Sequence, residues 1–255
     1  MAGEVLTESF GHVLVVTINR PERRNAIDHQ TALGLEAAWD QLDGDETLRA
    51  AVLTGAQQYF SAGADLTAVA AGGPGGSTAR RGQFGTIQDP PRKPVVAAIE
   101  GDALGGGCEL ALACDLIVAT RRSQMGLPEC RRGVLAAGGG VIRLPHRIPF
   151  NVAMEMALTG APQPAERLYA LGLVNRLCDV GEALAVALEL AKGIAANAPL
   201  AVIAAKRVMA GALTETEAAA WQLQKPEWER VRGSDDYREG ITAFVEKRAP
   251  RWRGK

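Results

Sequence analysis

The chain has 255 residues, of which 47% are hydrophobic and 22% are charged, and its net charge is −1. That composition supports one large domain, or one domain with an appendage, and it excludes the disordered class. Because 28 basic residues face 29 acidic ones, no overall positive field concentrates nucleic acid or anionic lipid, so neither is an expected partner.

The cysteines and the first residues bear on the cellular compartment. Four cysteines without C-x-x-C spacing are present: Cys108, Cys114, Cys130 and Cys178. A chain of this length does not need disulfide bonds to be stable, so we expect reduced thiols and a cytoplasmic location. We also expect no metal site. The first ten residues contain Glu4 and Glu8 and lack the apolar run of a secretory signal. No apolar stretch approaches the roughly 20 residues that span a bilayer, so no membrane partner is expected.

Strand and helix patterns alternate in the first third of the chain. Residues 13–18 are β-branched and apolar, as in a strand, and Asn19-Arg20-Pro21 ends them. Apolar residues at helical spacing predict a helix over 28–42 with Asp28 as its N-cap. Residues 50–55 read as a buried strand. The glycine-rich stretch 72–77 predicts a mobile loop. A more specific interpretation is that this loop forms a lid over the substrate.

The alternation continues through the middle of the chain. Residues 95–99 predict a strand, and three glycines at 105–107 lead into a short helix over 108–113. A strand follows at 116–119. A helix is expected over 164–171, with Gly172 just past its end, and a strand over 173–177. This order predicts an α/β fold.

From Gly181 onward only helical patterns remain. We expect helices over 182–197, 199–211 and 214 to about 230, then a last helix capped by Ser234. An all-helical tail of this size needs a surface to pack on. We therefore place a boundary near residue 195, with a core over 1–195 and a helical region over 196–255 that docks on the core, on a neighbouring subunit, or on both.

The run Gly105-Gly106-Gly107 offers exposed backbone N–H groups at the start of a helix. Such groups hold a developing negative oxygen. The alternative is that the glycines only permit tight packing of strand on helix. The spacing matches neither the dinucleotide fingerprint nor the P-loop, so those nucleotide sites are excluded.

Two acids accompany the glycine run, Glu109 directly after it and Glu129 in Leu127-Pro128-Glu129. Taken alone, each glutamate has a simpler explanation, because an acid in the first turn of a helix interacts favourably with the helix dipole. Together, amid apolar residues, they are candidates for raised pKa values and proton transfer. The same glutamate argues against Cys108 as a nucleophile, because an adjacent acid raises the pKa of a thiol.

A second loop, residues 60–66, follows the strand at 50–55 and presents another candidate N–H at Ala64. Two opposed donors hold an oxyanion better than one, and the loss of one donor typically costs about 2.7 to 4 kcal/mol. Asp65 beside it has the alternative role of a helix cap.

The order and spacing of these pieces resemble the enoyl-CoA hydratase/isomerase, or crotonase, superfamily over essentially the whole chain. The matching pieces are Asn19-Arg20-Pro21 with Asn25-Ala26, Phe60 to Asp65, Lys93-Pro94, Gly105 to Ala111, Cys114-Asp115, Leu127-Pro128-Glu129, Leu158-Thr159-Gly160, Leu171 to Asn175, and Ala243 to Arg248.

The resemblance implies a spiral of ββα units with a helical trimerisation region, assembled as a homotrimer or as a homohexamer built from two trimers. It implies an acyl-CoA thioester as substrate, with no cofactor besides it. Carried over by motif, the oxyanion hole is the N–H groups of Ala64 and Gly106, and Glu109 and Glu129 serve as base and acid of an enoyl-CoA hydratase. Substrate-binding positions by the same match are Ala26, Ala62, Asp65, Leu66, Gly105 and Ala137.

Three departures from the family pattern leave alternatives open. Ala136-Ala137 stands where many hydratases carry Pro-Gly, Leu127 where a glutamine is common, and Thr67 where a lysine often lies near the CoA phosphates. Phosphate contacts then fall to Arg23, Arg24 or Lys247. The segment at 127–129, with Ile142-Arg143-Leu144-Pro145 later in the chain, is also similar to carnitinyl-CoA dehydratases. An isomerase and a non-catalytic acyl-CoA binder are the remaining alternatives, and the retained acid pair argues against both.

Overall fold

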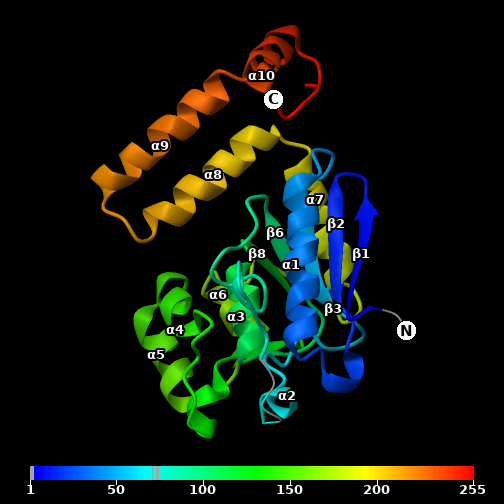
Figure 1. The fold of residues 1–255 in the computed structure, drawn as a ribbon. Coiled ribbons are helices and arrows are strands. Elements are labelled where there is room, and N and C mark those ends of the chain that lie inside the picture. The colour runs from blue at the N-terminus through cyan, green and yellow to red at the C-terminus, as the bar shows by residue number, and fades with distance from the viewer. Residues whose placement is uncertain (1–2, 71, 73–74) are drawn as a thin grey trace.

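A six-stranded mixed sheet forms the centre of the computed structural model, which describes residues 3–70, 72 and 75–255 (Figure 1). Its strands, in spatial order, are β1 (Val5–Phe10), β2 (Val13–Ile18), β3 (Ala50–Gly55), β6 (Val95–Ile99), β8 (Leu116–Thr120) and β11 (Arg176–Cys178). β1 pairs antiparallel with β2, and the other neighbours pair in parallel. The α/β class predicted from the alternation is confirmed.

Helices cover both faces of this sheet, and for that reason its central strands are apolar along their whole length. β3 and β6 are buried at every residue. On one face α1 (His29–Gly44) and α3 (Gly106–Ala113) share a core with Leu14, Val16 and Leu53. On the other, α7 (Ala183–Ala195) packs a row of alanines against Val15 and Val52. Alternate residues of each strand thus serve two separate cores.

The start of α1 follows the sequence signal. Asp28 has extended backbone angles, and its side chain accepts a hydrogen bond from the N–H of Thr31 at 2.9 Å. The helix then buries Leu35, Trp39 and Leu42 on one face. It ends at Gly44, two residues beyond the predicted end.

A second, small sheet carries the segments that lead into the candidate site. Its strands are β10 (Gln163–Pro164), β9 (Gln124–Gly126) and β7 (Ala103–Leu104). β7 runs directly into α3, and β9 runs into the 3-10 helix η2 (Pro128–Arg132). Because β7 and β9 pair in parallel, they bring the two glutamate-bearing segments to the same edge.

Short elements complete this half of the molecule. They are η1 (Pro21–Arg23), α2 (Leu66–Ala70), the hairpin of β4 (Ser77–Thr78) and β5 (Gly82–Gln83), α4 (Gly140–Arg143), η3 (Leu144–His146), α5 (Phe150–Thr159) and α6 (Ala165–Ala170). The predicted lid over 72–77 falls in part on residues 71, 73 and 74, which lie outside the described residues. The lid therefore stays a prediction.

The strand expected over 173–177 begins late, at Arg176. The carbonyl of Leu168 first accepts the N–H groups of Leu173 and Val174, at 2.9 and 3.3 Å. These bonds close α6 through Gly172, whose φ of +83° is the left-handed conformation expected past a helix end. Leu173 and Val174 therefore end the helix, although the apolar pattern assigns them to the strand.

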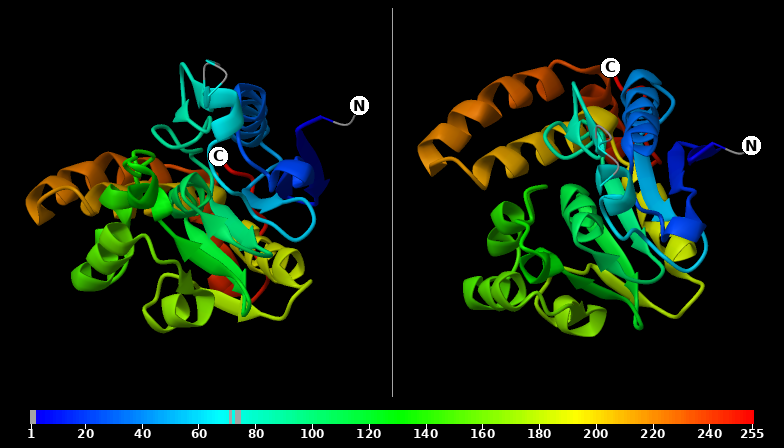
Figure 2. Two further views of the ribbon diagram at one scale, coloured as in Figure 1. Left: turned by 90° about the horizontal axis from the view of Figure 1, so that it is seen from below. Right: turned by 60° about the horizontal axis from the view of Figure 1, so that its bottom comes forward.

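Three helices form the tail: α8 (Pro199–Ala212), α9 (Glu217–Arg232) and α10 (Asp235–Glu246). α8 and α9 lie side by side and extend away from the sheet (Figures 1 and 2). Ser234 caps α10 as predicted, accepting the N–H of Tyr237 at 3.1 Å. Within the described residues no single helix is long and apolar enough to cross a bilayer; α7 and α8 meet that test only together, across a bend of 108°.

Polar contacts join the tail to the sheet. The ammonium of Lys206 lies 2.7 Å from the carboxylate of Asp115, and the guanidinium of Arg49 donates to the carbonyl of Trp252 at 3.1 Å. The tail therefore docks on its own core, one of the arrangements expected for it. The division of the chain near residue 195 remains a prediction.

Candidate active site

Glu109 lies in the first turn of α3 and is 2% exposed. Its Oε1 accepts a hydrogen bond from the backbone N–H of Gly140 at 2.9 Å. A Cβ placed on Gly138 would lie 2.5 Å from Oε2 of the same carboxylate. The second glycine run of the chain, residues 138–140, therefore encloses this side chain, and only residues without a Cβ can approach it so closely.

Burial raises the pKa of Glu109, and the negative charge of Glu129 raises it further. The backbone N–H groups of Gly140 and Gly138 and the guanidinium of Arg143 act in the opposite direction, because they stabilise the ionised form. Glu109 is thus a buried carboxyl with several groups arranged to hold its negative charge.

Glu129 is the second residue of η2, directly after Pro128. Its Oε1 lies beside Gly105, where a Cβ would be 3.2 Å away. Its Oε2 is buried, and among the described residues it has no hydrogen-bond partner. Burial raises the pKa of Glu129, opposed by its own backbone N–H and by Arg132. A buried oxygen without a donor favours the protonated acid.

The two acids therefore have different surroundings within one site. Backbone N–H groups of Gly138 and Gly140 hold Glu109, whereas Oε2 of Glu129 has no hydrogen-bond partner among the described residues. A site in which backbone donors hold one carboxylate and leave an oxygen of the other acid without a donor suits a proton acceptor beside a proton donor.

The candidate oxyanion donors meet at the N-terminus of α3. Gly63 has a φ of +83°, and a Cβ on it would lie 2.5 Å from the backbone nitrogen of Gly106. Ile27 holds this loop by donating to the carbonyl of Gly63 at 2.8 Å and accepting the N–H of Asp65 at 3.0 Å. Within the described part of the chain, the N–H groups of Ala64 and Gly106 donate to no acceptor. Two backbone donors without an acceptor in the described ranges thus lie on loops that touch.

The glycine run also has the packing role that was its alternative explanation. Gly105 has a φ of +57°, and a Cβ on Gly107 would collide with the backbone of Ser61. The run therefore permits close approach of the two loops and leaves the Gly106 N–H free. The packing role and the oxyanion-donor role are therefore compatible in the same three glycines.

Asp65 has a structural role in this loop, and its predicted substrate contact stays a prediction. One oxygen accepts the guanidinium of Arg20 at 3.0 Å, and the other accepts the N–H groups of Thr67 and Ala68 at 3.1 and 3.2 Å. With both oxygens used inside the protein, Asp65 caps α2 and fixes the loop that carries Ala64. This agrees with the helix-capping alternative.

The other predicted binding positions are placed around the same loops. Ala26 is buried, and its carbonyl accepts Arg20 Nη1 at 2.7 Å. Ala62, Leu66 and Ala137 are exposed. They are available to a ligand, and their predicted roles stay predictions.

The structure adds residues that the sequence does not single out. Phe84 is buried with a φ of +56°, and its ring lies against Gly106. Arg143 donates through Nη2 to the carbonyl of Ile87 at 2.6 Å, while its Nη1 is buried and, in the described ranges, unpartnered. Phe84 belongs to no recognisable motif, whereas Arg143 stands in Ile142-Arg143-Leu144-Pro145, a stretch similar to carnitinyl-CoA dehydratases. Only the folded chain brings them to Glu109 and Gly106.

Cys108 is fully buried, and burial, followed by the charge of Glu109, raises the pKa of its thiol. A thiol that resists ionisation is a poor nucleophile. This agrees with the sequence-based exclusion.

The sequence and the fold were compared with those of known proteins, and both match one family. The model of the enoyl-CoA hydratase/isomerase family matches residues 8–255. The chain is 37% identical to enoyl-CoA hydratase EchA19 of Mycobacterium tuberculosis, covering 99% of this chain and 97% of that protein. It is also 37% identical to carnitinyl-CoA dehydratase of Proteus mirabilis, with 96% of each covered. Its fold matches the crystal structure of an enoyl-CoA hydratase from M. tuberculosis H37Rv with a TM-score of 0.96 and 47% identity, covering 100% of both chains.

The family match spans nearly the whole chain, and the predicted spiral fold has solved counterparts with the same C-terminal helices. The chain therefore belongs to the enoyl-CoA hydratase/isomerase family.

Proposed function

We propose that this protein is an enoyl-CoA hydratase, which adds water reversibly across the 2,3 double bond of an enoyl-CoA thioester. The observation that carries this proposal is the arrangement of two unlike carboxyl groups beside two free backbone N–H groups. Glu109 is held by donors, Glu129 keeps an unpartnered oxygen, and Ala64 and Gly106 supply the N–H groups. Family relatives named as hydratases support it.

The mechanism follows from these groups. The thioester carbonyl accepts both N–H groups, which makes the β-carbon electrophilic and stabilises the enolate. Glu109 takes a proton from water as the water oxygen bonds to the β-carbon. Glu129 gives its proton to the α-carbon, and the enolate returns to a thioester. Glu109 then carries one proton and Glu129 has lost one, and exchange with solvent restores both.

Coenzyme A enters as part of the substrate, and we propose that no further cofactor takes part. Arg24 lies over the ring of Tyr59 with its guanidinium carbon 5.8 Å from the ring centroid. Lys247 ends α10 in the left-handed conformation. Both remain proposed contacts of the CoA phosphates.

Dehydration of carnitinyl-CoA is a second candidate, favoured by the equal identity to a carnitinyl-CoA dehydratase. It uses the same pair of acids in the reverse direction. The two activities differ in the acyl group rather than in the site chemistry.

We propose that the chain assembles as a homotrimer or as a dimer of trimers. The tail exposes large apolar side chains, among them Met209 (71%), Trp221 (59%), Phe244 (85%) and Val245 (72%). Exposed apolar groups of this size mark contact surfaces. Sedimentation equilibrium measures the state, and a monomer at micromolar concentration would contradict the proposal. A cytoplasmic location is proposed with it, consistent with four free cysteines in the structure.

The activity is tested by the loss of conjugated enoyl-thioester absorbance over short, medium, long and ring-bearing enoyl-CoA substrates, with carnitinyl-CoA assayed in the reverse direction. Hydration is expected for at least one enoyl-CoA. Glu109→Gln and Glu129→Gln should each lower kcat about 10²- to 10⁴-fold while remaining folded. Full turnover by both variants would overturn the acid-pair mechanism. Binding of many thioesters without turnover by the unmodified chain would instead indicate an acyl-CoA binder.

A further inference from the structure

Phe84 follows β5 directly, and its ring lies against the first residue of α3. The side chain is 1% exposed. A Cβ on Gly106 would lie 2.4 Å from Cζ and 2.6 Å from Cε2 of this ring, and 3.1 Å from the Cα of Gly63. The edge of the ring therefore occupies the place where position 106 would otherwise carry a side chain. No space is left on this side for the Gly106 backbone to move into.

The backbone of Phe84 has an unusual conformation. Its φ is +56°, in the left-handed region that a bulky residue rarely adopts. The neighbouring Gly85 has a φ of +62°, and a Cβ there would lie 2.1 Å from the carbonyl oxygen of Ala32 in α1. A left-handed aromatic residue costs conformational free energy and persists only where the surrounding structure holds it. Residues held in this way cluster at functional sites, so Phe84 is a candidate for a functional role.

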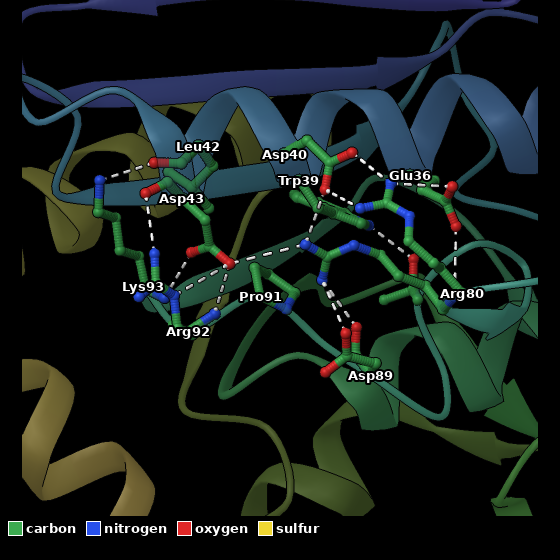
Figure 3. Close-up of polar contacts among 12 residues, drawn as sticks. Glu36, Trp39, Asp40, Leu42, Asp43, Arg80, Asp89, Pro91, Arg92 and Lys93 are labelled. Carbon is green, nitrogen blue, oxygen red and sulfur yellow. Dashed lines mark hydrogen bonds and ion pairs between the residues drawn. The ribbon is translucent and has the colours of Figure 1, made fainter.

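Contacts to the β4–β5 hairpin and to α1 hold Phe84 in place. Its N–H donates to the carbonyl of Gly76 at 2.5 Å, and its carbonyl accepts the hydroxyl of Thr86 at 3.1 Å. The same hydroxyl oxygen accepts the indole N–H of Trp39, a fully buried residue of α1, at 2.7 Å. Arg81, directly before β5, adds ion pairs with two acids of α1 (Figure 3). These contacts restrict the movement of Phe84 relative to α1.

The peptide unit between Gly105 and Gly106 carries the N–H that is proposed to bind the substrate carbonyl. Its own carbonyl oxygen accepts the N–H of Glu109 at 3.0 Å, the first hydrogen bond of α3. Because a peptide unit is planar, its orientation is set by this carbonyl oxygen at one end and by the Gly106 Cα at the other. The helix fixes the first end, and the ring of Phe84 packs beside the second.

We infer that Phe84 is a positioning residue of the oxyanion hole: its ring holds the Gly105–Gly106 peptide unit so that the Gly106 N–H meets the thioester carbonyl oxygen. The inference rests on the proposed hydratase function. Phe84 acts through Gly106, since its own side chain is buried. The effect is greatest on the enolate, whose oxygen carries more negative charge than the carbonyl from which it forms. Loss of the ring should therefore lower kcat more than it raises KM.

The stretching frequency of the thioester carbonyl reports the strength of this oxyanion hole without a reaction. The probe is the saturated analogue of the enoyl-CoA that the unmodified enzyme hydrates fastest, labelled with carbon-13 at the thioester carbonyl. Two aligned donors polarise the carbonyl and lower its frequency on binding, which infrared difference spectroscopy measures. In Phe84→Leu this shift should be smaller. Hydration should lose about tenfold in kcat, less than the roughly 10²- to 10³-fold loss when a whole donor is removed.

Two further variants separate positioning from stability. Phe84→Met keeps a longer, flexible side chain that fills space beside Gly106, so its carbonyl shift and kcat should lie between those of Phe84→Leu and the unmodified enzyme. Leu48→Ala is the matched control. Leu48 is 2% exposed and precedes β3, whereas the loop that carries Ala64 follows that strand. Its loss should lower the urea midpoint and leave the carbonyl shift of the bound probe unchanged.

The carbonyl shift decides the outcome. A shift in Phe84→Leu equal to that of the unmodified enzyme would overturn the role of Phe84, whatever the change in stability. If Phe84→Leu does not fold, Phe84→Met decides by the same comparison. A reduced shift in Leu48→Ala would show that any core defect loosens the site, and would also overturn a specific role. Hydration of no enoyl-CoA by the unmodified protein would overturn the proposed function and this inference with it.

Discussion

Oε1 of Glu109 and the backbone N–H of Gly140 form a hydrogen bond of 2.9 Å between residues that are 31 positions apart. This bond couples the geometry of one turn to the ionisation of the candidate base. Changes in the glycine run should therefore appear as changes in catalysis before they appear as changes in fold.

Gly138→Ala tests this coupling directly. The added Cβ would lie 2.5 Å from Oε2 and 2.9 Å from Cδ of Glu109, so the carboxylate must shift. A displacement of about 1 Å in a catalytic group costs on the order of 10²-fold in rate, and we expect a fall of that size in kcat. Gly193→Ala in α7, with nothing within 4 Å of the new Cβ, is the control. An active Gly138→Ala enzyme would contradict the placement of Glu109.

Glu129→Gln should stabilise the folded protein at neutral pH. Burial raises the pKa of Glu129 above its ordinary value of 4.5, so the folded state binds a proton more tightly than the unfolded state. That contribution is present below pH 4.5 and is lost as pH rises through the folded pKa. The glutamine variant does not titrate, so its gain in urea midpoint over the unmodified protein should grow with pH. A gain that is constant with pH would contradict a raised pKa.

Arg143→Met should shift the pH profile of hydration. Burial is the main cause of the raised pKa of Glu109, and Arg143 is among the groups that oppose it. Loss of the guanidinium should raise that pKa further, so the acidic limb of kcat/KM moves to higher pH. Arg143→Lys keeps a positive charge and should shift the limb less. An unchanged profile in the methionine variant would show that Arg143 only supports the carbonyl of Ile87.

Arg81→Met tests the ion pairs that tie the β4–β5 hairpin to α1. Arg81 is 6% exposed and pairs with Asp40 and Asp43. Removing one partner of a buried ion pair leaves charge uncompensated, and we expect a loss of about 3 kcal/mol in the free energy of unfolding. Arg92→Met removes a side chain that is 72% exposed from the same network (Figure 3) and should cost less than about 1 kcal/mol. Urea titration measures the free energy of unfolding of both variants. Equal losses in the two would contradict a larger contribution from the buried ion pair.

The central strands and their helices are predictable from sequence because their signals are local. Apolar runs define β3 and β6, and Asp28 and Ser234 are caps whose hydrogen bonds lie within three residues. The strand β1 is less visible, since it is an edge strand whose middle residues are exposed. α5 begins at Phe150, and the preceding Pro149 supplies no side-chain cap, so the start of this helix lacks the usual sequence signal.

The candidate site is predictable only where a motif recurs in a family. Glu109, Glu129 and Gly106 are found by motif, and the structure places them together. Phe84 and the guanidinium of Arg143 reach the site through long-range packing, and no spacing along the chain encodes that approach. Asp65 shows the opposite case, because its residue type suits a ligand contact while its folded position uses both oxygens for structure.

The residues of the candidate site precede the helical tail along the chain. The four groups proposed to take part in the reaction extend from Ala64 to Glu129, and the helical tail follows them. During synthesis these residues leave the ribosome before α8, α9 and α10 exist. The nascent chain therefore carries the complete set of reacting groups before the apolar surfaces of its tail are available to meet another chain.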